Sequence, residues 1–387
     1  MGMIGTALLI AATILLAAHL ATSGLYLARL GRKGPRRGVI GQPRISLLRP
    51  VCGLDAFDDE TLRSSFTQNY PDYEIIFCAP RQDDPVVPLV RRLIAEHRGV
   101  SARLLIGLDP ISGNPKLNNL WKGWQAADAD WICMTDSNLL LPDDYLSSLA
   151  ASWGPETGLV SGPPIGIRPD GLGGSLECAF LNSNQARLQF AAASLGKGFA
   201  QGKTLFWNRA LLEQAGGLAV LGRHLAEDVS ATKITRALGK QVSLPALPFP
   251  QPIGKRSIRQ VWDRQLRWSR VRRDGFPWLF AAEIANGAVL PACLCLGASL
   301  AIGLPTVLTL GFVGLWYGAE VLLMQHAGWP CGWRDIAALP LRDVAMPAVW
   351  GATFLRRGIE WRGTAMSTPP QASRAGAYPA DARGKIL

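Results

Sequence analysis

The chain has 387 residues, a formal net charge of +11 and a mean hydropathy of +0.14. Its 48% of hydrophobic residues can bury enough apolar surface to fold, which excludes a disordered protein. The seven cysteines are odd in number and form no C-x-x-C pair, which excludes a secreted disulfide scaffold and a cysteine-based zinc site. The basic residues stand beside apolar segments and no nucleic-acid-binding motif is present, so the charge indicates an anionic membrane surface as partner, and no nucleic acid.

The first predicted element is a transmembrane helix over residues 1–28. From Met3 to Ala28 there is no Lys, Arg, Asp or Glu, and a helix of that length spans about 39 Å, enough for a hydrocarbon core of about 30 Å. A basic linker over residues 29–42 follows, and the positive-inside rule places it in the cytosol. A cleaved signal peptide is the alternative, although the chain lacks the basic region that precedes the apolar run of such peptides.

Short β-type runs alternate with helical patterns through residues 43–250. The predicted strands are Ile45–Leu48, Tyr73–Cys78, Arg103–Ile106, Trp131–Thr135, Gly158–Ser161 and Gln241–Leu244. The predicted helices are Asp58–Gln68, Pro85–His97, Pro115–Ala127, Pro142–Trp153 and Asp228–Leu238. This alternation predicts an α/β domain around a mostly parallel sheet, in which ligands bind at the carboxyl ends of the strands.

Three polar residues of this domain are candidates for chemistry. Asp84 and Asp136 each follow a predicted strand, where a carboxylate can hold a divalent cation or a ribose hydroxyl. The alternative for both acids is a helix N-cap. Lys116 lies in the first turn of a predicted helix, where a cation opposes the helix dipole unless an anion is near. It therefore indicates a phosphate, and an ordinary exposed lysine is the alternative.

Further along the chain, Glu227 and Asp228 are adjacent acids at a predicted helix start, which taken alone is a weak signal and is often a cap. Residues 251–280 are predicted to form a basic interfacial helix. In it Arg264 shares a helical face with Arg267 and with Trp268. Two guanidiniums beside an indole can clamp a diphosphate and stack a sugar ring, and the same helix can also lie on a membrane.

The C-terminal part is predicted to return to the membrane. Residues 284–325 are apolar and break at Gly303-Leu304-Pro305, which predicts a transmembrane hairpin with two spans of about 20 residues each. Residues 336–355 are interrupted by Arg342, Asp343 and Pro347, and they are predicted to be re-entrant, interfacial or a marginal third span. The tail over 356–387 is basic and is predicted to be disordered.

These motifs together resemble those of a known group of enzymes. Asp84, Asp136, the Glu227-Asp228 pair and the Arg264-x-x-Arg267-Trp268 stretch are similar to the D, D, D, (Q/R)xxRW series of inverting glycosyltransferases with a GT-A fold. The chain resembles most the ceramide glucosyltransferase family, over about residues 45–275. Further stretches that carry this resemblance are Arg49-Pro50-Val51-Cys52-Gly53, Asn69 to Glu74, Asn114-Pro115-Lys116 and Gln214 to Leu218.

The resemblance implies a role for each site residue. Asp84, Lys116, Asp136, Arg264, Arg267 and Trp268 would bind the nucleotide sugar. Asp136 would also bind the metal, Mg²⁺ or Mn²⁺, that accompanies the diphosphate. Asp228 would be the general base that deprotonates the acceptor hydroxyl.

The expected enzyme is a multi-pass membrane protein whose catalytic domain faces the cytosol. It would transfer a hexose, with UDP-glucose as the first donor candidate, to ceramide and give a β-glycolipid. The alternatives are diacylglycerol or a hopanoid alcohol as acceptor, a processive polysaccharide synthase, and a catalytically inactive membrane scaffold. Asn138 and Gln185-Ala186-Arg187 depart from the family pattern and leave the sugar and the lipid open. The excess of Arg over Lys and the abundant Ala are typical of a bacterial protein.

Overall fold

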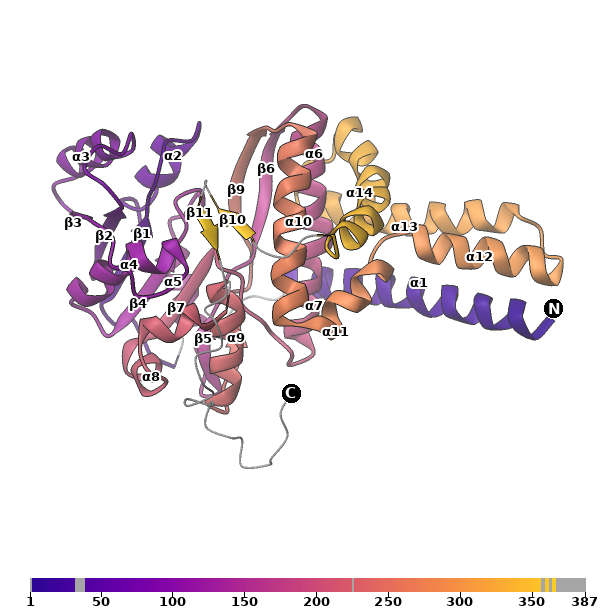
Figure 1. Cartoon of the computed structure of the whole chain (residues 1–387), viewed down its shortest axis with the longest axis horizontal. Coiled ribbons are helices and arrows are strands. Elements are labelled where there is room, and N and C mark those ends of the chain that lie inside the picture. The colour runs from indigo at the N-terminus through magenta and orange to yellow at the C-terminus, as the bar shows by residue number, and fades with distance from the viewer. Residues whose placement is uncertain (1, 32–38, 225, 356–358, 362–363, 367–387) are drawn as a thin grey trace. The chain divides into compact units, whose positions relative to one another are not determined.

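The computed structural model describes residues 2–31, 39–224, 226–355, 359–361 and 364–366 (Figure 1). Contacts divide the chain into two compact units. The sheet unit comprises residues 32–164, 192–252 and 358–387, and the helical unit comprises residues 1–31, 165–191 and 253–357. Most of the predicted basic linker and of the predicted tail, at 32–38, 356–358, 362–363 and 367–387, lies outside the described residues. The described residues of the tail form two antiparallel strands, β10 Ile359–Trp361 and β11 Thr364–Met366, so the prediction of a disordered tail is wrong for this part.

The sheet unit is built on seven strands in the order β3-β2-β1-β4-β7-β5-β8. Their bounds are β1 Ile45–Pro50, β2 Tyr73–Ala79, β3 Ser101–Ile106, β4 Trp131–Thr135, β5 Thr157–Val160, β7 Thr204–Asn208 and β8 Gln241–Ser243. Strands β3, β2, β1 and β4 run parallel, as do β5 and β8, while β7 is antiparallel to both of its neighbours. The predicted α/β class with a mostly parallel sheet is confirmed.

Helices connect these strands and cover the sheet: α2 Asp58–Arg63, α3 Val87–Glu96, α4 Pro115–Ala126, α5 Tyr145–Ala151, α8 Arg209–Gln214 and α9 Glu227–Ala237. The core consists of the buried faces of strands and helices, among them Leu47, Phe77, Leu146 and Phe206. Strand β7 was missed in the sequence because a short apolar run next to a helix cannot be distinguished from a buried helical turn by periodicity. A separate two-stranded sheet of β6 Pro164–Asp170 and β9 Phe249–Lys255 was missed as well. Residues 251–255, predicted to begin the basic interfacial helix, lie in β9, and the helix itself begins at Ile258.

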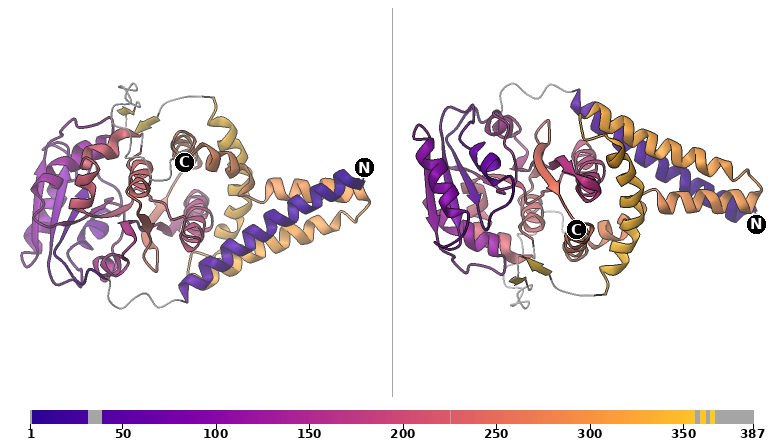
Figure 2. Two further views of the ribbon diagram at one scale, coloured as in Figure 1. Left: turned by 90° about the horizontal axis from the view of Figure 1, so that it is seen from below. Right: turned by 90° about the horizontal axis from the view of Figure 1, so that it is seen from above.

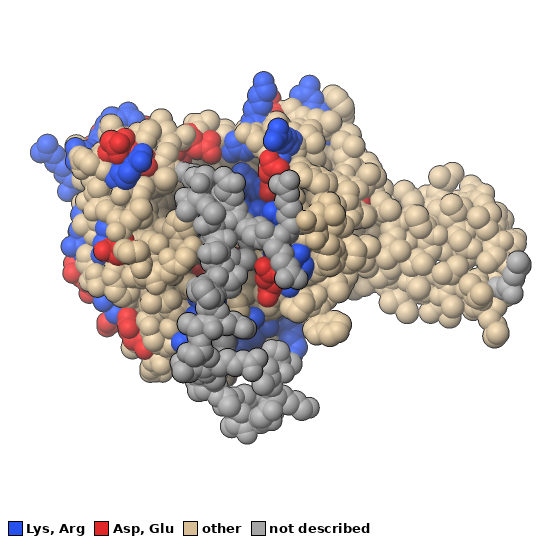
Figure 3. Space-filling view, in the orientation of Figure 1, with Lys and Arg blue, Asp and Glu red and all other residues tan. Residues whose placement is uncertain are grey.

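The helical unit contains α1 Gly2–Leu30, α6 Gly171–Ala179, the π-helix η1 Phe180–Ala186, the start of α7 Arg187–Ser194, α10 Ile258–Gly275, α11 Pro277–Ala282, α12 Val289–Ile302, α13 Val307–His326 and α14 Trp333–Ala352. Two of these helices, α1 and α13, are long and apolar enough to cross a membrane. Both views in Figure 2 show α1 alongside α12 and α13. In Figure 3 the visible face of these three helices carries no Lys, Arg, Asp or Glu.

The C-terminal hairpin differs from the prediction in the length of its first helix. The break at Gly303 is present, and α13 has the 20 residues expected of a span. However, α12 has only 14 residues, or about 21 Å, which is shorter than a hydrocarbon core of about 30 Å. Residues Pro277–Ala285 and α12 together form a third candidate span if they are counted as one helix with a bend of 53°. Residues 336–355 lie mostly in the single helix α14, which contains Pro340 and Pro347.

Candidate active site

The centre of the candidate site in the sheet unit is Lys116, in the first turn of α4. Its Nζ lies 2.6 Å from Asp136 Oδ1 and 2.7 Å from Glu227 Oε1. Asn114, the N-cap of α4, donates from Nδ2 to Glu227 Oε2 at 2.8 Å. Because the side chain of Lys116 is only 12% exposed, the alternative of an ordinary exposed lysine is wrong. The lysine joins the end of β4 to the start of α9.

A second lysine completes the environment of Asp136. Lys203 Nζ lies 3.0 Å from Asp136 Oδ2 and donates to Asn138 Oδ1 at 2.9 Å. Asp136 directly follows β4. The loop after it is fixed by the buried guanidinium of Arg49, which donates to the carbonyl oxygens of Ser137 and Leu139 at 3.0 and 3.2 Å. Asp136 therefore does not cap the next helix, α5, whose N-cap is Asp144.

Asp228 has different partners from its neighbour Glu227. Its Oδ2 accepts from the backbone N–H of Gly202 at 3.0 Å, and its Oδ1 accepts from the N–H of Val229 at 2.8 Å. The carbonyl oxygen of the same glycine accepts from Lys116 Nζ at 2.5 Å. A Cβ at Gly202 would lie 2.7 Å from Glu227 Oε1, so a larger residue here would displace the Glu227 carboxylate that contacts Lys116.

Burial and the neighbouring charges set the ionisation of these groups. Burial alone would raise the pKa of Asp136, but Lys116 and Lys203 outweigh it and hold that pKa well below its ordinary value. Burial, together with the negative charge of Glu227, raises the pKa of Asp228 to about 6, against the opposing effect of the Gly202 N–H. Two acids of one site thus have pKa values displaced in opposite directions, which is typical of sites with separate binding and proton-transfer roles.

Asp84 is 4% exposed and lies at the carboxyl end of β2, in the loop before α3. Its carboxylate accepts from the N–H of Gly53 at 2.8 and 3.1 Å and from the N–H of Val86 at 3.0 Å. It therefore orders the loop that follows β1, and it also satisfies an N–H next to the start of α3, so the structural alternative of a cap is partly correct.

The remaining predicted site residues lie on α10, in the helical unit. Arg264 Nη1 lies 2.6 Å from Glu177 Oε1, and the Arg264 guanidinium lies 5.9 Å from the ring centroid of Trp268. Trp268 packs against the buried Cys178, Leu181 and Ile253. Arg267 lies on the same helix, between these two motif residues.

Several site residues were not identified from the sequence. They are Arg49, Asn114, Asn138 as a polar partner, Glu177, Gly202, Lys203 and the pairing of Glu227 with Lys116. The only local signal for Lys203 is a Gly-Lys pair directly before an apolar run. Arg49 and Asn114 stand in stretches that carry the family resemblance, and Asn138 departs from its pattern. No local signal shows the contacts of these residues, because their partners are distant in the sequence.

A divalent cation would find few protein ligands here. Among the described residues, no cluster of three or more His, Cys, Asp or Glu side chains is placed to hold a metal ion. The donor set at the predicted position is the carboxylate of Asp136, 26% exposed, with the Asn138 amide oxygen nearby. One carboxylate completed by substrate phosphates and water is a common Mg²⁺ environment, so the residues fit such an ion. Lys116 and Lys203 would compete with it for the two oxygens of Asp136.

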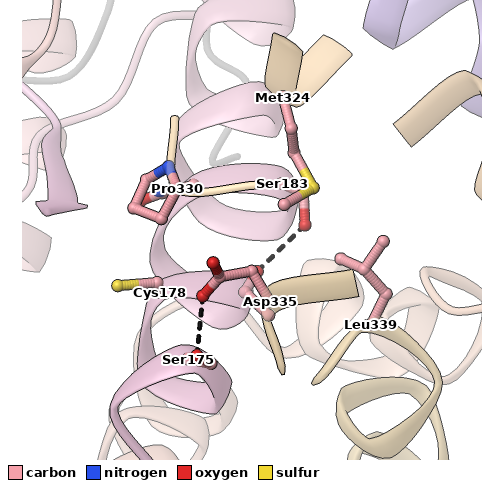
Figure 4. A pocket seen from close by; sticks show the side chains of 9 residues that line it. Ser175, Cys178, Ser183, Met324, Pro330, Asp335 and Leu339 are labelled. Carbon is pink, nitrogen blue, oxygen red and sulfur yellow. Dashed lines mark hydrogen bonds between the residues drawn. The ribbon is translucent and has the colours of Figure 1, made fainter. Parts of the chain in front are cut away.

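The helical unit has a small cavity of about 10 Å³ (Figure 4). It is lined by Ser175, Cys178, Ala179, Asn182, Ser183, Met324, Pro330, Asp335 and Leu339. Ser175 Oγ donates to Asp335 Oδ1 at 2.6 Å beside it. This volume accommodates about one water molecule, so the cavity is too small for a sugar or a lipid headgroup.

An α/β unit with ordered acids at the carboxyl ends of its strands, followed by an RxxRW helix, is the arrangement that the resemblance to glycosyltransferases with a GT-A fold implies. Residues 8–373 match the sequence pattern of Glycosyl transferase family 21. The chain belongs to that family.

The curated relatives that the chain matches are ceramide glucosyltransferases. The chain is 26% identical over 264 residues to ceramide glucosyltransferase 1 of Caenorhabditis elegans, covering 68% of this chain and 56% of that protein. It is 24% identical over 335 residues to ceramide glucosyltransferase 3 of the same organism, covering 83% and 72% of the two chains. A ceramide glucosyltransferase of Komagataella phaffii is 27% identical over 289 residues, with 59% of this chain and 56% of that protein covered. The match thus spans little more than half the length of the first relative.

Among solved structures, the chain is similar to the mannosyltransferase PcManGT of Pyrobaculum calidifontis in complex with GDP-Man and Mn²⁺. The TM-score is 0.48 at 18% identity, and the match covers 87% of this chain and 99% of that one. It is also similar to TarS of S. aureus in complex with UDP-GlcNAc, with a TM-score of 0.39 at 13% identity, over 85% of this chain and 97% of that one.

Proposed function

We propose that this glycosyltransferase is a membrane-bound inverting enzyme that transfers a hexose, with glucose as first choice, from UDP-sugar to the hydroxyl of a lipid, with ceramide as first choice. The observation that carries the proposal is the cluster of Lys116, Asp136, Lys203 and Glu227 with Asp228 beside it. It combines cations suited to a diphosphate with a carboxylate of raised pKa suited to accept a proton.

Asp228 acts in this proposal as the general base. A lipid hydroxyl is a weak nucleophile while it is protonated, so a carboxylate must take the proton as the oxygen attacks the anomeric carbon. The Gly202 N–H fixes one oxygen of Asp228 at 3.0 Å. Direct displacement at the anomeric carbon with one base gives inversion, and hence a β-glycoside from an α-linked donor.

In this proposal the leaving diphosphate is stabilised by lysine and arginine side chains. The lysines are Lys116 and Lys203, which form ion pairs with Asp136. The arginines are Arg264 and Arg267 of α10. A bidentate guanidinium matches phosphate oxygens, and an ammonium adds a point charge. Trp268 supplies an apolar surface for the sugar or the acceptor. Asp84 orders the Gly53 loop on the nucleotide side.

The metal in this proposal is Mg²⁺ or Mn²⁺, held by Asp136 and the diphosphate oxygens. When bound, it neutralises charge that develops on the leaving diphosphate. We expect excess EDTA to abolish transfer and either ion to restore it. Asp136→Asn should lose orders of magnitude in activity, because a neutral amide replaces the carboxylate ligand. Activity is measured as release of UDP; full activity in EDTA would show that Asp136 has no metal-binding role.

The lipid acceptor is supported by the relatives, which are ceramide glucosyltransferases, and by the apolar helices α1 and α13. In this proposal the chain is multi-pass, and its catalytic unit faces the cytosol, as the basic residues after α1 indicate. Reporters fused after residue 40 and at residue 270 should therefore both be cytosolic. A periplasmic or lumenal signal at either position would contradict this orientation.

The direct test is production of the chain in a host that lacks glycolipids of its own, followed by mass spectrometry of the lipids. A new hexosyl lipid that is absent with the Asp228→Asn variant supports the proposal. Radiolabelled UDP-glucose with separated lipid and polymer fractions adds a second measurement. Label in the polymer fraction alone would indicate a processive synthase and contradict the lipid acceptor.

A further inference from the structure

Glu177 is a buried carboxylate outside every motif that the sequence analysis identified. It lies on α6 and is 1% exposed, and its Oε1 accepts from Arg264 Nη1 at 2.6 Å. An ionised carboxylate at this depth is costly unless a cation and hydrogen bonds compensate it. The cation that compensates it is the first arginine of the RxxRW motif.

The backbone of α6 is held close to the chain segment that leads into α10. A Cβ at Gly173 would lie 2.0 Å from the carbonyl oxygen of Arg256, which directly precedes the N-cap of α10, Ser257. Ser257 and Gln260 form a capping box that fixes where α10 begins. The position of Glu177, one turn after Gly173, is therefore defined relative to α10.

Contacts continue along the same faces of the two helices, which lie side by side in Figure 1. Leu181, one turn beyond Glu177, belongs to the buried cluster against which Trp268 packs. Trp268 lies one turn beyond Arg264, and its ring centroid is 5.9 Å from the Arg264 guanidinium. Arg264 is thus held from two sides, by the Glu177 carboxylate and by the Trp268 ring, while 24% of its side chain stays exposed.

We infer that Glu177 is a positioning residue that holds the Arg264 guanidinium in the orientation in which it binds the diphosphate of the nucleotide sugar. A free arginine has many rotamers, and an arginine oriented in advance loses less entropy when it binds phosphate. The inference rests on the proposed function, because it assigns a purpose to the orientation of Arg264. The inference predicts an effect on the donor alone: a change at Glu177 should weaken the binding of the nucleotide sugar and leave the binding of the lipid unchanged.

The test is Glu177→Gln in the full chain in detergent, with UDP-glucose and a short-chain ceramide as substrates. Glutamine keeps the shape and removes the charge, so we expect the KM for UDP-glucose to rise about tenfold while the KM for ceramide changes less than twofold. A merely structural defect would reduce the amount of active enzyme, and therefore kcat, with both KM values unchanged. The matched control is Glu283→Gln, which removes the carboxylate partner of Arg272, another arginine of α10; it should leave the KM for UDP-glucose unchanged.

A double-mutant cycle decides whether Glu177 acts through Arg264. Arg264→Ala alone should raise the KM for UDP-glucose, and adding Glu177→Gln to it should change that KM less than twofold. The same tenfold rise in both backgrounds would overturn the inference, as would an unchanged KM in the Glu177→Gln single variant. If Arg264→Ala itself leaves the KM for UDP-glucose unchanged, the diphosphate role of Arg264 in the proposed function is wrong, and the inference fails with it.

Discussion

Replacing Asp228 with asparagine is expected to lower kcat by roughly 10²–10⁴, the usual contribution of a positioned general base. Asparagine keeps the size of the side chain and can still accept from the Gly202 N–H, but it cannot take the proton of the acceptor. Binding of the nucleotide sugar should change little, because in the proposed function the diphosphate is bound by Lys116, Lys203, Arg264, Arg267 and the metal held by Asp136. Single-turnover kinetics and UDP-sugar binding, measured separately, check the two halves of this prediction.

The pH dependence of kcat/KM tests the role of Asp228 more specifically. A base works in its ionised form, so kcat/KM should fall about tenfold per pH unit below the pKa of Asp228, which is raised to about 6, and should level off above it. The pKa is raised by burial and by the negative charge of Glu227. In the Asp228→Asn variant this acid limb should disappear from the pH profile.

Glu227→Gln is the matched control for Asp228→Asn. Its effect on kcat should be far milder, because the carboxylate of Glu227 accepts from Lys116 and Asn114 and Asp228 remains to take the proton. Since the neighbouring negative charge is lost, the acid limb of kcat/KM should move to lower pH. If Glu227→Gln stopped the chemistry and Asp228→Asn abolished donor binding, the two acids would have the opposite roles.

The second large effect is expected at Arg342 in the helical unit. Its guanidinium forms a bidentate pair with Glu320 of α13 at 2.9 Å and contacts Asp343 at 2.6 Å and Ser183. All three charged side chains are at most 1% exposed. Arg342→Met removes the cation and leaves two buried carboxylates without it, which is expected to lower the free energy of unfolding by about 3–5 kcal/mol.

Chemical denaturation in detergent micelles measures this loss. Arg334→Met, an exposed position on the same helix, is the matched control and should change the free energy of unfolding by less than about 0.5 kcal/mol. The Arg342→Met and Glu320→Gln changes should be strongly non-additive, because both remove the same pair. Additive effects, or an Arg342→Met variant as stable as Arg334→Met, would show that the buried network does not hold α13 and α14 together.

This network extends to the N-terminal helix. Arg187 Nη1 lies 2.9 Å from His19 Nδ1 of α1, and the His19 ring stacks on Trp316 of α13 at 3.8 Å. Arg187 lies 168 positions from His19. Buried polar groups between apolar helices need hydrogen-bond partners, and here these groups are partners of one another. Gln185-Ala186-Arg187, noted in the sequence as a departure from the family pattern, thus includes an arginine that binds the α1 helix.

Local patterns in the sequence were sufficient for six of the strands and for the long apolar helices, but not for β6, β7 and β9. All six predicted strands are present, and the long apolar runs are the helices α1 and α13. These features depend on residues that are neighbours along the chain, where the alternation of apolar and polar side chains directly reflects which face is buried. The motif residues Asp84, Asp136, Asp228 and Arg264 were found because each has a characteristic neighbourhood in the sequence.

The tertiary structure alone decided which charges meet. Lys116 and Glu227 are 111 positions apart, and Glu177 and Arg264 are 87 positions apart, so no periodicity connects them. Strand β7 lies between β4 and β5, and Lys203, directly before the first residue of β7, is thereby placed beside Asp136. An ion pair forms where the fold brings opposite charges together away from water, and that proximity depends on strand order and helix packing. The sequence by itself therefore determined six strands, the long apolar helices and the candidate motif residues of this enzyme, and the fold decided which side chains are partners.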